Sequence, residues 1–379
     1  MADKKTFNTL DLFSGCGGMS LGLSWSSYKG SRMRSIGAVD IWDDACRTFE
    51  ANVGHAPICG PVDEAVVTRI LKEVGKIDVV VGGPPCQGFS TSGKRALGDR
   101  RNRLVRQFLS SVEIAGPKAF VMENVTGFTS FQNGRIFEEV VEFAENLGYK
   151  ISAGVLMATR AGVPQRRRRF FMVGVRSGGF VFPNSVAGDV VGTGKLLIDQ
   201  RSDGGFPIVT FDDATSDLSH ISAGQQSDKY RCPPRNEFQK WARGKGTSVS
   251  DHIASRHSPE FVEMMSFLEP GESALDPIVA KRMPARIRPT SGFPNSYSRI
   301  RGNLPAPTIT RNFTTPSSAN CIHPKSDRAL SLREGARCQS FPDWYEFLGN
   351  MGSKRLQIGN AVPPLLAKSL GDALLRALT

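Results

Sequence analysis

The chain has 379 residues, of which 40% are hydrophobic and 22% are charged, as in an ordinary globular protein. Its 48 Lys and Arg outnumber its 36 Asp and Glu, and the resulting net charge of +12 favours a polyanionic partner such as nucleic acid. The absence of an apolar run near 18 residues excludes a membrane span. Seven scattered cysteines without a CxxC pair argue for a reducing compartment, and against a disulfide framework or a metal site.

The first 175 residues alternate between strand-like and helix-like patterns. Helices are expected at 43–52 and 135–148, and a glycine turn that opens a helix at 14–26. The alternation predicts an α/β fold with a mostly parallel sheet covered on both faces, whose ligands bind at the carboxyl ends of the strands. The expected strands are 6–13, 35–42, 76–83, 117–125, 150–158 and 168–175.

The amino-acid composition changes after Gly178, where the chain becomes rich in Gly, Pro, Ser and Asn. Only short β-like runs stand out, at 206–211 and 306–313, which predicts a smaller and irregular domain. A proline start and an apolar helical stripe predict a terminal helix over 363–378. We therefore expect a catalytic domain at 1–178 completed by 345–379, and a second domain with its hinge at 179–344.

A glycine turn follows the first expected strand in DLFSGCGG, which contains Gly15, Gly17 and Gly18. Asp40 ends the second strand 25 residues after Gly15, near the spacing at which an acid holds ribose hydroxyls in nucleotide-binding folds. These residues alone do not distinguish a dinucleotide from an adenosine-bearing methyl donor. A tight structural turn with a helix-capping acid is the plainer alternative.

A second group of motifs points to chemistry at the same edge of the sheet. In GGPPCQGFS, two prolines fix the backbone before Cys86, whose other interpretation is a buried thiol in a turn. ENV puts Glu123 at the end of a strand, and alternation along QRRRRF sends Arg167 and Arg169 to one face. QIGNAVP forms the last loop. Each motif has a plain structural explanation, but chance does not produce this set in this order.

The ordered set FSGCGG, PPCQGFS, ENV, QRRRR and GNAVP resembles the DNA cytosine C5-methyltransferases over nearly the whole catalytic framework. The resemblance implies a Rossmann-like methyltransferase sheet that binds S-adenosylmethionine, with a smaller, irregular and β-rich target-recognition domain. It implies Cys86 as the nucleophile and Glu123 as the residue that contacts the cytosine ring. Arg167 would face the oxygen of the base, and Arg169 would support the pocket and the cysteine.

The resemblance also implies a set of cofactor-binding residues. Phe13 would stack against the adenine, and Asp40 would hold the ribose although the family usually has glutamate there. Pro61 stands where an acid for the adenine amino group is expected, with Asp63 two residues on. The full set is Asp11, Phe13, Gly15, Gly17, Gly18, Asp40, Ile41, Pro85, Leu104 and Asn360.

The family's substrate is a cytosine rotated out of double-stranded DNA, which the resemblance implies here as well. A glycine-containing, basic stretch after the nucleophile and a second basic stretch at 281–311 suit phosphate contacts and some base readout. The expected DNA-binding residues are Gln87, Ser90, Ser92, Lys94, Arg299, Arg301 and Arg311.

We thus expect a monomeric, cytoplasmic enzyme of bacterial or phage type that methylates cytosine C5 in DNA. An RNA cytosine methyltransferase on the same framework and an inactive DNA-binding relative stay open as alternatives. An NAD-dependent oxidoreductase with a redox cysteine would explain Asp40 and the glycines, but none of the later motifs.

Overall fold

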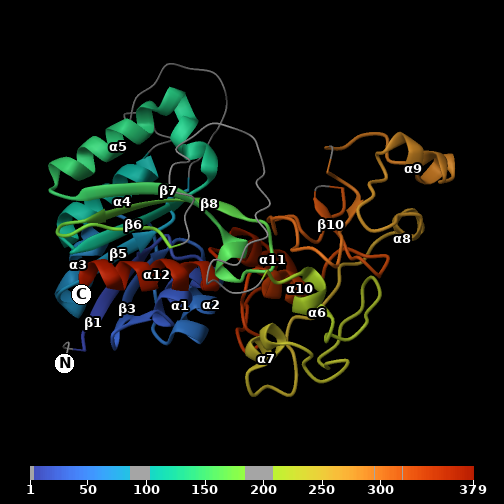
Figure 1. Cartoon of the computed structure of the whole chain (residues 1–379), viewed down its shortest axis with the longest axis horizontal. Coiled ribbons are helices and arrows are strands. Elements are labelled where there is room, and N and C mark those ends of the chain that lie inside the picture. Colours follow the sequence, from blue (N-terminus) through green and yellow to red (C-terminus); the bar gives the residue numbers. More distant parts are fainter. Residues whose placement is uncertain (1–3, 86–102, 184–207, 294, 318) are drawn as a thin grey trace. The chain divides into compact units, whose positions relative to one another are not determined.

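The computed structural model describes residues 4–85, 103–183, 208–293, 295–317 and 319–379. The chain forms two compact units (Figure 1). Unit 1 comprises Met1–Met157, Arg168–Gly205 and Pro364–Thr379, and unit 2 comprises Ala158–Arg167 and Phe206–Pro363. None of the helices in the described ranges has the length and apolar character that a membrane span needs.

Unit 1 contains a twisted sheet with the strand order β2-β3-β1-β5-β6-β8-β7, and β4 pairs with β3 outside this path. The central strands β3, β1, β5 and β6 are parallel, whereas β8 runs antiparallel to both β6 and β7. The strands are β1 (Thr6–Leu12), β2 (Ser27–Tyr28), β3 (Ser31–Asp40), β4 (Ile58–Cys59), β5 (Val79–Gly82), β6 (Ala119–Asn124), β7 (Lys150–Met157) and β8 (Arg168–Val175).

Alternation along β1 separates the two faces of this sheet. Leu10 and Leu12 belong to a large apolar core shared with three helices, while Thr9 and Asp11 point to the opposite face. The helices of the first face contribute apolar stripes at helical spacing to that core. They are α3 (Glu64–Val74), α4 (Arg103–Ala115) and α5 (Arg135–Asn146). The 3₁₀ segment η2 (Thr126–Gly134) directly precedes α5.

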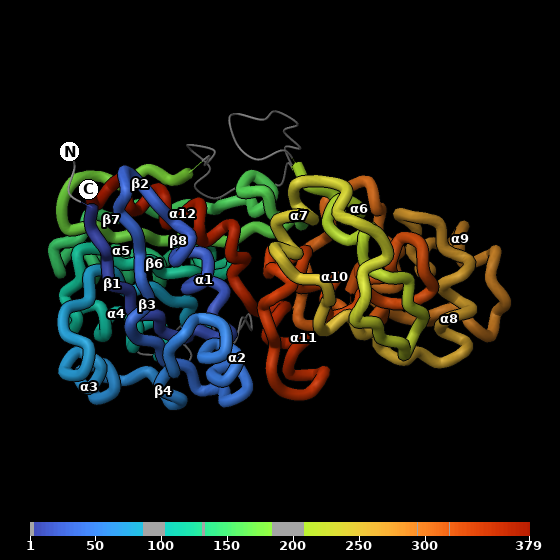
Figure 2. Tube along the Cα trace, turned by 90° about the horizontal axis from the view of Figure 1, so that it is seen from below, coloured from blue at the N-terminus to red at the C-terminus, as the bar shows by residue number. Residues whose placement is uncertain are grey.

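The opposite face is covered by α1 (Gly18–Ser24) and α12 (Pro364–Leu378), which pack closely together although they come from the two ends of the chain (Figure 2). Gly22 makes this approach possible, because a Cβ there would collide with the carbonyl oxygen of Pro364. Another helix, α2 (Asp43–Val53), follows β3 directly. The mostly parallel, two-faced sheet predicted from the sequence is confirmed.

Regular elements are short in the described residues of unit 2. The run 306–313 forms no strand. Of the run 206–211, residues 206 and 207 lie outside the described part of the chain, 208–210 form no strand, and the helix α6 begins at Phe211, so the prediction of β-like structure is wrong for the described residues of both runs. QIGN of the last motif belongs to α11 and not to a loop. The elements are η3 (Ala158–Ala161), α6 (Phe211–Thr215), α7 (Glu237–Arg243), α8 (Pro259–Ser266), α9 (Pro277–Lys281), η4 (Ala285–Ile287), β9 (Ser298–Arg299), β10 (Asn320–Ile322), α10 (Leu332–Cys338) and α11 (Met351–Asn360).

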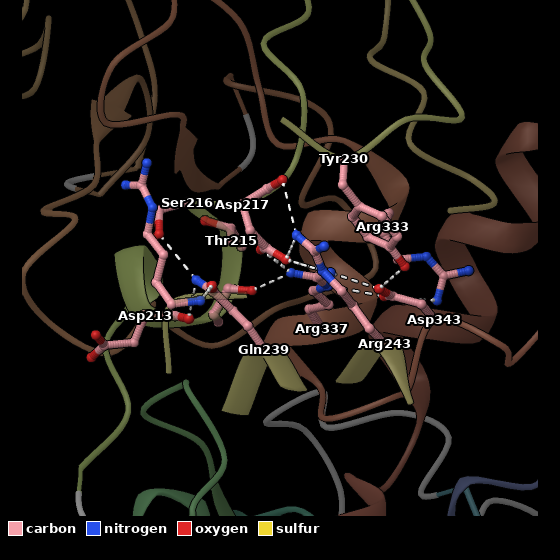
Figure 3. A network of polar contacts seen from close by, with 12 residues as sticks. Asp213, Thr215, Ser216, Asp217, Tyr230, Gln239, Arg243, Arg333, Arg337 and Asp343 are labelled. Atoms are coloured by element: carbon pink, nitrogen blue, oxygen red, sulfur yellow. Dashed lines mark hydrogen bonds and ion pairs between the residues drawn. The ribbon is translucent and has the colours of Figure 1, made fainter. Parts of the chain in front are cut away.

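A buried network of charged side chains joins these short elements (Figure 3). Arg337 of α10 forms ion pairs with Asp217 and Asp343, and none of these three side chains is more than 2% exposed. Arg243 of α7 donates a 2.6 Å hydrogen bond to Asp217, and the Tyr230 hydroxyl donates one of 2.7 Å to Asp343. These buried charges satisfy one another, and they connect segments that are far apart in the sequence.

Candidate active site

The first part of the site is the loop between β1 and α1. Phe13, Gly15 and Gly17 all have left-handed backbone conformations, with φ of 57°, 52° and 85°. The amide of Gly15 donates a 2.7 Å hydrogen bond to Asp40 Oδ2, and the amide of Trp42 donates one of 2.9 Å to Oδ1. The carboxylate at the end of β3 is therefore fixed against the glycine loop, as the spacing of the two motifs suggested.

Asp11 supports this loop from inside unit 1. Its carboxylate accepts a 2.6 Å hydrogen bond from the Ser20 hydroxyl of α1, and only 1% of the residue is exposed. Burial raises the pKa of Asp11 to about 7, with a smaller contribution from the nearby charge of Asp40. Burial also raises the pKa of Asp40. The side chain of Asp11 thus has almost no exposed surface, and its expected contact with a cofactor stays a prediction.

The other expected cofactor residues of unit 1 differ in exposure. Ile41 is 75% exposed, Pro85 is exposed, and Leu104 is half-buried in the first turn of α4. Asp63 is the N-cap of α3, where its Oδ1 accepts a 2.9 Å hydrogen bond from the amide of Val66. Asp63, two residues after Pro61, therefore has a structural role as a helix cap.

The carboxyl end of β6 lies beside the proline turn that precedes Cys86. The Asn124 Nδ2 donates a 3.2 Å hydrogen bond to the carbonyl of Pro84, and this asparagine is 4% exposed. A Cβ at Gly83 would come within 3.0 Å of Glu123 Oε2, so the missing side chain leaves room for that carboxylate. Cys86 itself lies outside the described residues.

Arg169 completes this part of the site from the neighbouring strand β8. Its Nε lies 2.9 Å from Glu123 Oε1, and the two side chains are 18% and 15% exposed. Burial lowers the pKa of Arg169, and the charge of Glu123 opposes that shift. An ion pair in a partly desolvated position is stronger than one at the open surface.

Arg167 has a different environment from the one expected. It is fully buried, and its two terminal nitrogens donate hydrogen bonds of 2.8 and 3.0 Å to the carbonyls of Ile309 and Gly359. The strand β8 begins at Arg168, so the alternation that should place Arg167 and Arg169 on one face does not extend to Arg167. This environment differs from the expected position facing the base, since the guanidinium connects two backbone segments of unit 2.

Gln165 is a buried residue that the sequence analysis did not single out. Its Nε2 donates a 2.8 Å hydrogen bond to the carbonyl of Cys338, and its Oε1 accepts one of 3.0 Å from the amide of Ile309. The only signal for it was its place at the head of QRRRR. Asn360 is the exposed last residue of α11.

The expected DNA contacts divide into three groups. Gln87, Ser90, Ser92 and Lys94 lie outside the described residues. Arg299 is 5% exposed, donates hydrogen bonds to the carbonyls of His323 and Ser326 and pairs with Asp327, so little of its side chain is free for the expected contact with DNA. Arg301 and Arg311 are exposed and have no side-chain partner within the described part of the chain.

A model of the family of C-5 cytosine-specific DNA methylases matches residues 7–376. The chain belongs to this family. It is an enzyme of the DNA cytosine-5 methyltransferase class, since both the motifs and the match extend over almost its whole length. The methyltransferase fold predicted from the sequence is confirmed by the same match.

Relatives in this methyltransferase family resemble the chain from end to end. It is 33% identical to the type II methyltransferase M.AgeI of Thalassovita gelatinovora, covering 97% of this chain and 98% of that one. It is 34% identical to M.DdeI of Desulfomicrobium norvegicum, with 96% and 88% covered. A crystal structure from E. coli, assigned as a prophage-encoded DNA modification methyltransferase, superimposes with a TM-score of 0.73 at 25% identity, covering 98% and 99%.

Proposed function

We propose that this methyltransferase moves a methyl group from S-adenosylmethionine to C5 of a cytosine flipped out of double-stranded DNA, through a transient bond between Cys86 and C6. The ion pair of Glu123 and Arg169 beside Gly83 is the observation that carries the proposal. A carboxyl group and a guanidinium here lie next to the turn that leads to the nucleophile. Such a pair suits the edge of a cytosine, which offers a ring nitrogen and a carbonyl oxygen.

The residues around Asp40 fit a nucleoside-bearing cofactor. At Gly15 an added Cβ would meet no atom within 4 Å, so the loop borders open space. Each Asp40 oxygen accepts one backbone hydrogen bond and keeps capacity for a ribose hydroxyl. The exposed Ile41 offers an apolar surface to a base. S-adenosylmethionine, when bound there, supplies an electrophilic methyl group.

The chain's own residues make the cytosine reactive. In the proposed mechanism the Cys86 thiolate adds to C6, and the electron pair of the C5–C6 double bond becomes available at C5. Glu123 holds a proton against ring N3 while negative charge develops on the ring, which is electrostatic stabilisation of the adduct. Once C5 carries the methyl group, a base removes the C5 proton, the double bond forms again and the thiolate leaves.

Within this mechanism the two arginines have other roles than the motif suggested. Arg169 is the guanidinium beside Glu123 and is partly exposed, so we infer that it donates to the carbonyl oxygen of the base. Arg167 acts as a structural residue of unit 2. In this assignment Arg169 acts on the base and Arg167, two positions earlier, supports the fold.

We infer that unit 2 chooses the DNA sequence, in keeping with the target-recognition domain expected at 179–344. The net charge of +12 suits a DNA partner. The type II methyltransferases among the relatives support methylation within one short recognition sequence, as in restriction–modification systems.

Bisulfite sequencing of host DNA after expression tests this function. Unconverted cytosines in one recurring context are expected with the wild-type chain, and none with Cys86→Ser, because a hydroxyl is hardly ionised near pH 7. Cys232→Ser, a half-buried cysteine of unit 2, is the matched control and should keep full methylation. Substantial methylation by Cys86→Ser would remove the nucleophile assignment, and 5-methylcytosine found only in RNA would redirect the substrate.

A further inference from the structure

Unit 2 contains a cleft of about 400 Å³ beside the two-stranded sheet of β9 and β10. Its lining includes Arg166, Arg299, Arg301, Asn295 and Ser273. No carboxylate is present among the described residues that line it. Asp327, which does not line the cleft, pairs with Arg299, so two guanidinium groups remain there without an acid and form a candidate site for an anion.

Most arginines of the basic stretch have partners within the protein, so that DNA would compete with those partners for them. Arg282 pairs with Glu272, Arg286 pairs with Glu263, and Arg288 donates to the carbonyl of Met283. Arg299 is likewise engaged by Asp327. The density of basic residues in the sequence thus overstates the free positive charge of this region. Within the described part of the chain, Arg166 and Arg301 are exposed and lack a side-chain partner, and both line the cleft.

The backbone that carries these two arginines is fixed by hydrogen bonds and close packing. The amide of Arg166 donates a 2.8 Å hydrogen bond to Ala306, and its carbonyl accepts one of 2.7 Å from the Thr308 hydroxyl. Arg301 lies against Gly271, where an added Cβ would collide with its guanidinium, and the amide of Gly271 is bound to the carbonyl of Arg299 at 2.8 Å. These contacts fix the points at which the two arginine side chains leave the backbone.

We propose that this cleft binds one phosphate of the DNA backbone, held jointly by Arg166 and Arg301. The proposal rests on the proposed function, because it takes DNA as the substrate. Guanidinium groups match the oxygens of a phosphate in geometry and charge, and an anion between them relieves the repulsion of two like charges. Only Arg167 and Arg168 separate Arg166 from Arg169 in the sequence. The proposed phosphate contact and the residue that we infer to meet the base thus belong to one short sequence motif.

The test is equilibrium binding of DNA duplexes over a salt series, with S-adenosylhomocysteine present. One duplex carries the methylated context found by bisulfite sequencing and the other lacks it. Arg166→Gln and Arg301→Gln should each weaken binding about tenfold on both duplexes. Each should also lower the slope of log affinity against log salt by about one. The double variant should lose little more than either single variant, because both remove the same phosphate contact. Arg301→Lys should keep the slope, since it keeps the charge.

Arg231→Gln is the matched control, because Arg231 is exposed in unit 2 but does not line the cleft. It should leave affinity and slope unchanged. Unchanged slopes in the cleft variants, fully additive losses, or losses confined to the duplex with the recognition context would each overturn the phosphate assignment. If the wild-type chain binds DNA and only the variants behave otherwise than expected, the proposed function survives. If the wild-type chain binds no DNA at all, both proposals fail.

Discussion

Glu123 and Arg169 form an ion pair across two neighbouring antiparallel strands, with 2.9 Å between Oε1 and Nε. The carboxylate comes from the end of β6, and the guanidinium comes from the start of β8. This geometry depends on the reversed direction of β8, which brings the beginning of one strand beside the end of the other.

Replacing Arg169 should reduce methyl transfer with little effect on stability. We expect Arg169→Gln to lower kcat about a hundredfold, the loss typical of removing one donor that stabilises developing charge. Arg168→Gln is the control, because Arg168 is the exposed neighbour on the same strand. Single-turnover transfer to a radiolabelled duplex measures both, and equal rates for the two variants would contradict the role of Arg169.

Replacing Arg167 should mainly reduce stability, in contrast to the loss of methyl transfer expected for Arg169→Gln. Arg167→Gln leaves the buried carbonyls of Ile309 and Gly359 without their donors, and each such loss costs about 1–3 kcal/mol. The expected result is a clearly lowered Tm, with the DNA affinity of the remaining folded protein retained. A variant with the wild-type Tm but no turnover would return Arg167 to the site of chemistry.

The buried carboxyl group of Asp11 should make stability depend on pH. Its pKa of about 7 lies above the value near 3.8 of an unfolded chain, so the unfolded chain releases its proton first as the pH rises. The stabilising contribution is complete below pH 4, is lost as the pH rises toward 7, and stays lost above it. The full loss is on the order of 4 kcal/mol.

Asp11→Asn removes this dependence while keeping an acceptor for the Ser20 hydroxyl. We therefore expect the Tm of Asp11→Asn to rise relative to that of the wild type between pH 5 and pH 7. At higher pH the difference between the two Tm values should stay constant. Thermal unfolding at a series of pH values measures the difference. A Tm difference that does not change with pH would mean that Asp11 is ionised over the whole pH series.

The network around Arg337 should be needed for the stability of unit 2. Arg337→Leu leaves Asp217 and Asp343 buried without their main partner, and breaking such a pair costs about 3–5 kcal/mol. Arg231→Leu, at an exposed position, controls for the change in charge. Limited proteolysis should cleave unit 2 of Arg337→Leu far faster than that of the control. Equal cleavage would show that the network is dispensable.

The sequence predicts the main elements of unit 1 because their signals are local. Uninterrupted apolar runs mark β5 and β6, and apolar spacing marks α5 and α12. The direction of β8 is not a local property, since an apolar run reads the same in a parallel and an antiparallel strand. The structure of unit 2 was harder to predict from the sequence, because it contains buried ion pairs between residues such as Asp217 and Arg337, 120 positions apart.

In the candidate site, too, some features follow from local sequence patterns and others do not. The pairing of the glycine loop with Asp40 follows from the spacing of motifs at the carboxyl ends of parallel strands. The roles of Arg167 and Arg169 do not follow, because they depend on where the strand begins. Alternation predicts one face for both, yet β8 starts between them at Arg168. The burial of Arg299 was hidden as well, since charge counts do not show which arginines have partners inside the protein.

The division of the chain has a consequence for how specificity can change during evolution. The chain passes between its two units four times, so unit 2 consists of one short segment, Ala158–Arg167, and one long segment, Phe206–Pro363. A gene exchange that replaces the long segment alone leaves Gln165 and Arg167 behind. Most of their partners are backbone groups, at Cys338, Ile309 and Gly359. An incoming segment of quite different sequence can therefore meet the same two side chains, provided that its backbone follows the same path.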